Sequence, residues 1–333
     1  MDNSLYGRKW ELSVQCSDGT FLTVGNDGIS GVESLKCTFQ INYPGYEGWY
    51  FSEFNIWNPM PSTSLKIIEE GAQVFFSAGY GRGKYGQIFG GRVFQAFSTR
   101  ENVTDYKLTL LCVDGSKLFK DNFTAFSRTA GYTYSSLLND VAQYSQSPIS
   151  MGQISNYIKD IQFPRGVTVF GSPSAIGREV CRSNNLQMFM KDEKWQFTHL
   201  SDIPEGTALE IDPSSGLIGT PEQTDYGISF RTLLDPTLQI ANPPKWVKID
   251  LSKINVKQQR AVIGKDLVGV LQLETSPWNG YFKVGGVVHS GDTRGQEWYT
   301  DVVGYSFAGK KPLQLEPTVP GITKNPRYDA NGN

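Results

Sequence analysis

The segment from Gly81 to Gly86 has the glycine spacing that comes closest to a known chemical motif. It fits the G-x-G-x-x-G pattern of loops that hold the phosphates of a dinucleotide, and it follows an apolar run over 73–78. In such loops the glycines open a helix whose N-terminus binds the pyrophosphate. Here Gln87-Ile88-Phe89 and a second glycine pair follow, which indicates a strand. We therefore predict a flexible hairpin connection and no nucleotide cofactor.

Nucleophilic catalysis has little support, because the chain has only two histidines, His199 and His289. His289 precedes Ser290, but neighbouring residues of a strand point to opposite faces and cannot share a proton. A G-x-S-x-G elbow is missing too, since Gly28-Ile29-Ser30-Gly31 lacks one spacer residue. We expect both histidines to be ordinary strand or loop residues and predict no catalytic residue.

Two pairs of adjacent carboxylates, Glu69-Glu70 and Asp192-Glu193, stand in turn-like surroundings. A glycosidase needs only two acids that the fold brings together, so a hydrolase stays open as an alternative. Turn-like surroundings favour solvated charges over a catalytic pair. We therefore predict that the chain is not an enzyme.

Composition narrows the remaining classes of site. The four cysteines lie too far apart in sequence to suggest a metal cluster, and we expect reduced thiols and no bound metal; they are Cys16, Cys37, Cys112 and Cys181. The net charge of -2 and the lack of a basic run disfavour electrostatic binding of nucleic acid. The first residues lack the layout of a signal peptide, and no apolar run approaches 18 residues, so we predict no membrane insertion.

The elements that must carry any function are mostly strands. Up to about residue 120, apolar and polar residues alternate with period two, for example over 35–42 and 106–113. From about residue 203 such runs return, over 228–233 and 246–251. Glycine and proline turns separate the runs, so the class is mainly β.

Between these regions the pattern changes to that of a small α/β module. Thr133 is a candidate N-cap for a helix that reaches about Tyr144. Ser172-Pro173 predicts a second helix, which ends near Asn184-Asn185, and a strand follows over 186–190. The apolar spacing over 154–161 also suits a short helix that ends before Pro164.

A repeat links the two strand-rich regions. Gly90-Gly91 and Gly285-Gly286 each follow an aromatic strand and precede a strand, a polar turn and an aromatic-rich strand, at an offset of 285 − 90 = 195 residues. This spacing is too long for a solenoid. It indicates a β domain duplicated around an insertion.

Two groups of short motifs resemble the baseplate hub family of contractile-tailed bacteriophages and related injection machines. The first group comprises Phe54-Asn55-Ile56-Trp57-Asn58, residues 67–74, Ala78-Gly79-Tyr80 and residues 88–93. The second comprises residues 215–221, 226–228 and 233–236. The chain departs from the family pattern at Val93, where Ile is usual, and at Asp235, where Asn is usual. The order and spacing of the motifs carry the resemblance from about residue 10 to 310.

The resemblance and the patterns together predict a mainly β fold with two tandem antiparallel β-barrel domains, similar to tail-tube proteins, that flank a small LysM-like α/β module. The predicted boundaries are 1–120 for the first barrel, 121–200 for the module and 201–310 for the second barrel. Residues 311–333 are rich in proline and form a predicted extended arm.

The family implies a structural virion protein of the tail baseplate, assembled in the host cytoplasm. Three chains would present six similar barrels and so adapt a six-fold tail tube to a three-fold central spike. The implied partners are the chain itself in a homotrimer, the spike protein, tube or tube-initiator proteins, other baseplate components, and genomic DNA that passes through without sequence-specific binding. Two alternatives stay open: a peptidoglycan-binding or peptidoglycan-hydrolysing tail protein, and the hub of a phage-tail-like injection system.

Overall fold

The structure is a computed structural model that describes most of the chain. The described residues are 7–15, 19, 21–26, 35–45, 48, 50–61, 64, 72–81, 83–119, 122–203, 206–224, 227–241, 244–250 and 280–306. Several features named above lie wholly or partly outside them: the arm 311–333, Glu69-Glu70, Cys16, the segment Gly28-Ile29-Ser30-Gly31 and part of the motifs at 67–74 and 226–228.

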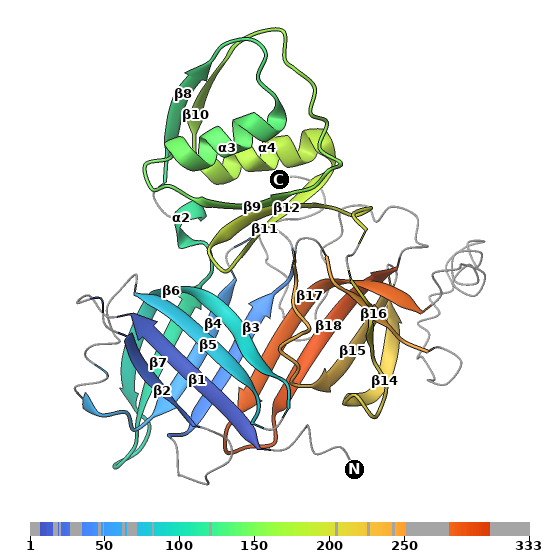
Figure 1. Ribbon diagram of the computed structural model, residues 1–333. Coiled ribbons are helices and arrows are strands. Elements are labelled where there is room, and N and C mark those ends of the chain that lie inside the picture. Colours follow the sequence, from blue (N-terminus) through green and yellow to red (C-terminus); the bar gives the residue numbers. More distant parts are fainter. Residues whose placement is uncertain are drawn as a thin grey trace, which may run out of the picture.

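One large sheet of thirteen strands dominates the fold (Figure 1). Its first half comprises β1 (Arg8–Gln15), β2 (Phe21–Asn26), β3 (Cys37–Tyr43), β4 (Phe51–Trp57), β5 (Gln73–Tyr80), β6 (Tyr85–Arg100) and β7 (Tyr106–Val113). Its second half comprises β13 (Leu209–Glu210), β14 (Leu217–Thr224), β15 (Gly227–Leu233), β16 (Trp246–Lys248), β17 (Tyr281–Asp292) and β18 (Trp298–Ser306). The strand order is β14-β15-β18-β17-β3-β4-β7-β6-β5-β1-β2, with β16 beside β17 and β13 beside β16.

The period-two pattern explains how these strands divide into faces. In β3 the buried residues Cys37, Phe39, Ile41 and Tyr43 alternate with partly or fully exposed ones, as the sequence predicts. β3 pairs antiparallel with β4, where Phe54 and Ile56 are fully buried. One face of the sheet therefore carries the core.

The first half of the sheet is rolled around Phe76 of β5. Its ring lies 4.7 Å from that of Phe39 in β3 and 4.9 Å from that of Phe54 in β4, measured between centroids. β3 and β4 are not sheet neighbours of β5, so these contacts bridge the interior of a curved sheet. The same core extends into the second half, because Phe39 also contacts Trp298 at 5.3 Å.

The predicted mainly antiparallel β fold is confirmed, but the described strands do not close into two separate barrels. A strand has two edges, and β3 uses one for β4 and the other for β17 of the second half. No edge of β3 is left to close the first half on itself. Instead, the Arg8 guanidinium at the start of β1 donates to the carbonyl oxygens of Asp292 (2.9 Å), Gly295 (2.5 Å) and Gln296 (3.0 Å) in the β17–β18 turn.

The α/β module has a core of its own and lies above the sheet in Figure 1. Its elements are α2 (Ser116–Phe119), β8 (Thr124–Arg128), α3 (Tyr134–Tyr144), β9 (Ser150–Ile154), β10 (Val167–Gly171), α4 (Pro173–Asn184), β11 (Leu186–Lys191) and β12 (Lys194–His199). β9, β12 and β11 form a small sheet under α3 and α4, and β8 pairs with β10. No described helix is long and apolar enough to cross a membrane. The LysM-like character and the exact domain boundaries stay predictions.

Both predicted helix starts are confirmed. Thr133 caps α3 and forms a capping box with Ser136, and Ser172 caps α4, with Pro173 in the first turn. α4 ends at Asn184, and the C-cap residue Asn185 has a left-handed φ of 58°.

The helix suggested over 154–161 is wrong. Ile154 ends β9 instead, and the hydroxyl of Ser155 donates to buried Asp202 at 2.6 Å. These tertiary bonds and the nearby Pro164 override the apolar spacing.

The two halves of the sheet contain the same arrangement of five strands. In the first half the order is β3-β4-β7-β6-β5, and in the second it is β14-β15-β18-β17-β16. If the five strands of each unit are numbered in chain order, their order across the sheet is 1-2-5-4-3 in both units. This shared topology supports the duplication that the sequence indicates.

The two glycine pairs, however, are not equivalent positions. Each lies inside a strand rather than before one. The register shift between β6 and β7 falls at Phe94, whereas the one between β17 and β18 falls at Gly285. Alignment on these bulges gives an offset of 285 − 94 = 191 residues, four fewer than the glycine pairs suggest. Each pair serves its own close contact: a Cβ on Gly91 would lie 2.6 Å from the oxygen of Val113, and one on Gly285 2.0 Å from the ring of Tyr305.

We predict that Phe76→Ala lowers the free energy of unfolding by about 3–5 kcal/mol, because it leaves a cavity between β5 and the strands β3 and β4. β5 has no backbone hydrogen bonds to β3 or β4, so the side-chain contacts of Phe76 are what joins them. Phe170→Ala is the matched control, since Phe170 is 78% exposed and its truncation should change stability by less than about 1 kcal/mol. Urea denaturation followed by tryptophan fluorescence measures both. Equal losses in the two variants would contradict a core centred on Phe76.

Candidate functional site

The glycine-rich segment 81–86 is the turn between β5 and β6, as predicted. At this turn, the Lys84 ammonium forms an ion pair with the buried carboxylate of Asp235. In addition, the side-chain amide of Gln239 donates to the carbonyl oxygen of Gln87 at 2.6 Å. The hairpin is thus as predicted, and its flexibility stays a prediction. Asp235, one of the two departures from the hub pattern, links the second half of the sheet to the first.

Both histidines have structural surroundings. His289 in β17 is fully buried, its Nδ1 lies 2.9 Å from the hydroxyl of Thr300, and burial lowers its pKa to about 3. Ser290 pairs with Tyr299 and Gln40 and points to the opposite face. His199 stacks on Tyr157 with ring centroids 4.7 Å apart. The hydroxyl beside His289 belongs to Thr300, which is itself fully buried and out of reach of a substrate.

The carboxylate pair Asp192-Glu193 forms the two-residue turn between β11 and β12. Both residues have positive φ values, 52° and 61°, as a type I′ hairpin requires. The buried carboxylate of Asp114 accepts hydrogen bonds from both turn N–H groups, at 2.7 Å from Asp192 and 2.8 Å from Glu193. The Glu193 side chain in turn pairs with Arg92 of β6 at 3.1 Å. The turn is thus as predicted, but it docks on the large sheet rather than standing free in solvent.

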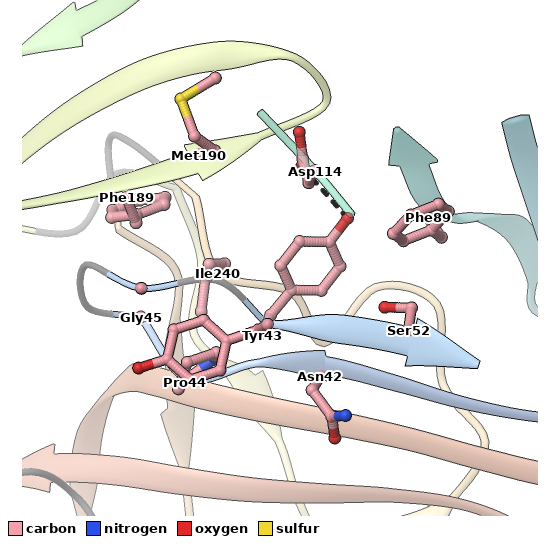
Figure 2. Close-up of a pocket in the computed structure, with 12 residues that line it drawn as sticks. Asn42, Tyr43, Pro44, Gly45, Ser52, Phe89, Asp114, Phe189, Met190 and Ile240 are labelled. Carbon is pink, nitrogen blue, oxygen red and sulfur yellow. Dashed lines mark hydrogen bonds between the residues drawn. The ribbon is translucent and has the colours of Figure 1, made fainter. Parts of the chain in front are cut away.

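Asp114 therefore connects the module to the sheet, together with Tyr43 and Lys191. The Tyr43 hydroxyl donates to Asp114 at 3.3 Å (Figure 2). The Lys191 ammonium lies 4.2 Å from the centre of the Tyr43 ring. Burial raises the pKa of Asp114 to about 7, although the N–H donor of Glu193 and the charge of Lys191 act in the opposite direction. Burial also raises the pKa of the Tyr43 hydroxyl. We call Tyr43, Asp114, Lys191, Asp192 and Glu193 the Asp114 joint.

Sequence reasoning missed the Asp114 joint. The available signal was the pair Asp114-Gly115 directly after the strand that ends at Val113, because Asp-Gly favours a turn. The residues that Asp114 holds are 78 and 79 positions away along the chain. No local pattern predicts that approach.

The pockets beside the joint are too small for a substrate. Two lie where the module meets the sheet, and each has a volume of about 20 Å³, enough for roughly one water molecule. Figure 2 shows the first, between Tyr43, Asp114 and Phe189. Within the described ranges, no group of three histidine, cysteine, aspartate or glutamate side chains could hold a metal ion.

The face of the sheet that points away from the core carries polar and charged side chains around β3 and β4. The charged ones include Glu53, and also Lys36 and Lys107, whose ammonium groups lie over the ring of Trp57. Cross-strand pairing places Thr38 beside Asn55 and Asn55 beside Thr109, and the Thr109 hydroxyl donates to Asn55 at 2.7 Å. Gln40 pairs with Glu53 on one side and Ser290 on the other. This polar face (Thr38, Gln40, Asn55 and Ser290, with Glu53 as its acidic member) spans the junction of the two halves, whereas Thr109 beside Asn55 is buried.

Comparisons with known proteins identify the fold. No protein-family model matches the sequence, and no curated protein matches it. Among solved structures, the 43 kDa tail protein of prophage MuSo2 from Shewanella oneidensis superposes with a TM-score of 0.52 at 9% identity, over 90% of this chain and 99% of that one. At this identity the likeness concerns the fold, and the predicted resemblance to tail-hub proteins is confirmed at that level.

Two further structures are similar at lower scores. A tail protein from Neisseria meningitidis has a TM-score of 0.46 at 9% identity, over 91% of this chain and 97% of that one. The E. coli c3393 protein has a TM-score of 0.47 at 9% identity, over 86% and 79%. It is described as a component of the type VI secretion system with structural similarity to T4 bacteriophage tail proteins gp27 and gp5.

We predict that Asp114→Asn changes how stability depends on pH. A carboxyl whose pKa is raised in the folded state binds more protons there than in the unfolded chain, so its contribution to stability falls as pH rises from about 4 to 7. In the variant this loss disappears. Between pH 4 and pH 8, the free energy of unfolding of the variant should therefore rise relative to that of the parent chain by about 1.4 kcal/mol per unit of pKa shift.

Asp212→Asn provides the control for Asp114→Asn. Hydrogen bonds from Ser214 and Ser215 lower the pKa of the Asp212 carboxyl. The effect of Asp212→Asn on the free energy of unfolding should therefore depend on pH only below about pH 4. Chemical denaturation at several pH values measures both variants. A pH-independent difference between Asp114→Asn and the parent chain would contradict the raised pKa.

Proposed function

We propose that the chain is a structural protein of a phage tail and, specifically, the trimeric baseplate hub that joins a six-fold tail tube to a three-fold central spike. The observation that carries the proposal is the repeated five-strand unit within one continuous sheet, in a fold shared with a prophage tail protein. A single chain thus presents two similar surfaces side by side.

The duplication suits an adapter between two symmetries. Three copies around a three-fold axis contain six five-strand units, and these can meet a six-fold ring with six similar contacts. The rest of the chain can then meet a three-fold partner. The link between the halves supports this role, because β3 and β17 are paired over six residues each and hold the two units in one orientation.

We further propose that the polar face lines a channel for genomic DNA. Its side chains are hydroxyls and amides, and Glu53 adds negative charge. The two lysines at its end, Lys36 and Lys107, lie over the Trp57 ring, and Lys36 pairs with Asp292, so the face has little net positive charge to hold phosphates as DNA passes. The partners of such a hub are the spike protein, tube or tube-initiator proteins and other baseplate components, in a virion assembled in the host cytoplasm. The proposed role requires no catalysis.

A second candidate is peptidoglycan binding by the module. The observation in its favour is a pair of exposed aromatic rings, Phe123 and Phe170, which contact edge to face at 4.5 Å on the β8–β10 ribbon. Exposed aromatic pairs often mark recognition surfaces. Sedimentation with purified sacculi, with and without Phe123→Ser and Phe170→Ser, tests this candidate. If the parent chain binds sacculi and each of the two substitutions abolishes that binding, peptidoglycan binding is favoured over a purely structural role.

We predict that the purified chain forms a homotrimer that captures a spike protein encoded beside it. Native mass spectrometry at assembly-like concentrations should show three copies, and co-expression should yield a complex of three chains with the spike. A chain that stays monomeric alone and in the presence of the spike would contradict the hub.

The same samples should show no turbidity loss on cell-wall suspensions, whereas lysis would favour the hydrolase alternative.

A further inference from the structure

We propose that the module clamps the two five-strand units of the chain together. Its β11–β12 hairpin binds both units at once and thereby fixes the angle between them at the seam, which is the pairing of β3 with β17. The inference goes beyond the proposed function, because it concerns a single chain and holds for a monomer and a trimer alike. Three contacts carry it, one at each end of the hairpin and one at its centre.

The turn end of the hairpin binds the first unit. The Glu193 carboxylate pairs with Arg92 of β6 at 3.1 Å, and the side-chain amide of Gln87, also in β6, donates to the Asp192 carboxylate at 3.3 Å. A Cβ on Gly90 would lie 2.9 Å from the same carboxylate, so this glycine lets the turn approach the backbone of β6 closely. The turn is therefore fixed to the first unit by charge, hydrogen bonding and shape.

The open end of the hairpin binds the second unit. His199 is the last residue of β12, and its carbonyl oxygen accepts a hydrogen bond from the Lys283 ammonium of β17 at 2.7 Å. Lys283 is buried, and burial lowers its pKa to about 8, whereas the charge of Asp202 acts in the opposite direction. A buried ammonium is costly without hydrogen-bond partners. At this point β17 therefore depends on the module.

The two faces of β11 belong to different cores. Met188 and Met190 face the core of the module. On the opposite face, Phe189 belongs to the core of the large sheet, and the Lys191 ammonium lies over the Tyr43 ring of β3. Figure 1 shows β11 and β12 between the helices of the module and the large sheet. The hairpin is thus shared between the two cores.

Phe189, at the centre of the hairpin, lies between the two units. It lines both pockets at the boundary of the module and the sheet. The first pocket, drawn in Figure 2, is also lined by Tyr43 and Phe89 of the first unit. The second is also lined by Val284 and Tyr305 of the second unit. One side chain of the module therefore contacts the region where the two units meet.

The seam needs such a clamp, because strand pairing alone leaves the angle between two strands adjustable. Neighbouring strands of a sheet differ in twist by about −10 to −35°. The Arg8 contacts hold the seam at the end where Asp292 lies. The hairpin holds the opposite end, where Tyr43 pairs with Val287. With both ends held, the two units keep one angle.

Pulsed electron paramagnetic resonance tests the clamp through the distance between two spin labels. Gln95→Cys in β6 and Thr220→Cys in β14 place the labels at exposed sites of different units. Cys16 is replaced by serine throughout, because the other three cysteines are buried. Labelled chain is diluted into unlabelled chain, so that an assembly carries one labelled pair. We expect a single narrow distance distribution for the parent chain.

Phe189→Ala should at least double the width of this distribution, and Phe189→Ala/Lys283→Met should widen it further. Met188→Ala is the matched control. Met188 neighbours Phe189 in β11 and is 2% exposed, but it faces the module core, so its truncation leaves a cavity away from the seam. The control should keep the width of the parent chain. Equal widening in Phe189→Ala and Met188→Ala, or no widening in the double variant, would overturn the clamp.

Hydrogen exchange covers the case in which Phe189→Ala does not fold. Arg92→Gln removes the ion pair at the turn end of the hairpin and changes no residue of β3 or β17. Amides over 38–43 and 287–292 should exchange at least threefold faster in this variant, whereas those of β7 should keep the rate of the parent chain. Lys283→Met, which acts at the open end, should accelerate the same segments. Unchanged exchange at the seam in both variants would show that the hairpin does not hold the two units.

Discussion

The pairing of β3 with β17 is the contact on which the rest of the structure depends. It joins residues about 250 positions apart in sequence, 287 with 43 and 292 with 38, and turns two five-strand units into one sheet. Close backbone approach makes this possible: Gly45 has a φ of +76°, and a Cβ there would lie 1.7 Å from the oxygen of Gly285. The pairing of β3 with β17 also buries Phe39 against Trp298 and leaves His289 fully buried. Because β3 is committed to this pairing, neither unit closes by itself.

Other long-range contacts support the same arrangement from different sides. Arg8 spans from β1 to three carbonyl oxygens of the β17–β18 turn, and Lys84 pairs with Asp235. Both contacts link the first half of the sheet to the second. They are charge-assisted and partly buried, a setting in which hydrogen bonds are stronger than at an open surface. The relative orientation of the two units is therefore held at several points.

The module is attached through several polar contacts around one buried carboxylate. The Asp114 carboxylate accepts hydrogen bonds from both N–H groups of the Asp192-Glu193 turn and from the Tyr43 hydroxyl. In addition, Glu193 pairs with Arg92, and the Lys283 ammonium donates to the carbonyl oxygen of His199 at 2.7 Å. Such a joint is polar and small, and its pockets hold about one water molecule each. It positions the module without offering a substrate site. The module accordingly resembles an appended unit, with its own core, more than a part of the sheet.

The sequence alone determined the local features, since these depend on neighbouring residues. The strands around Phe39 and Leu110, the helix starts at Thr133 and Ser172, and the left-handed end at Asn185 all follow from period, capping and turn chemistry. The existence of a repeat was also readable, because two strand-turn-strand patterns recur. Only the tertiary structure decided which strand edges meet, how the repeats align and where Asp192 and Glu193 dock. Those outcomes depend on contacts between residues far apart in the chain, and a periodic pattern states which face of a strand is buried but not which strand lies beside it.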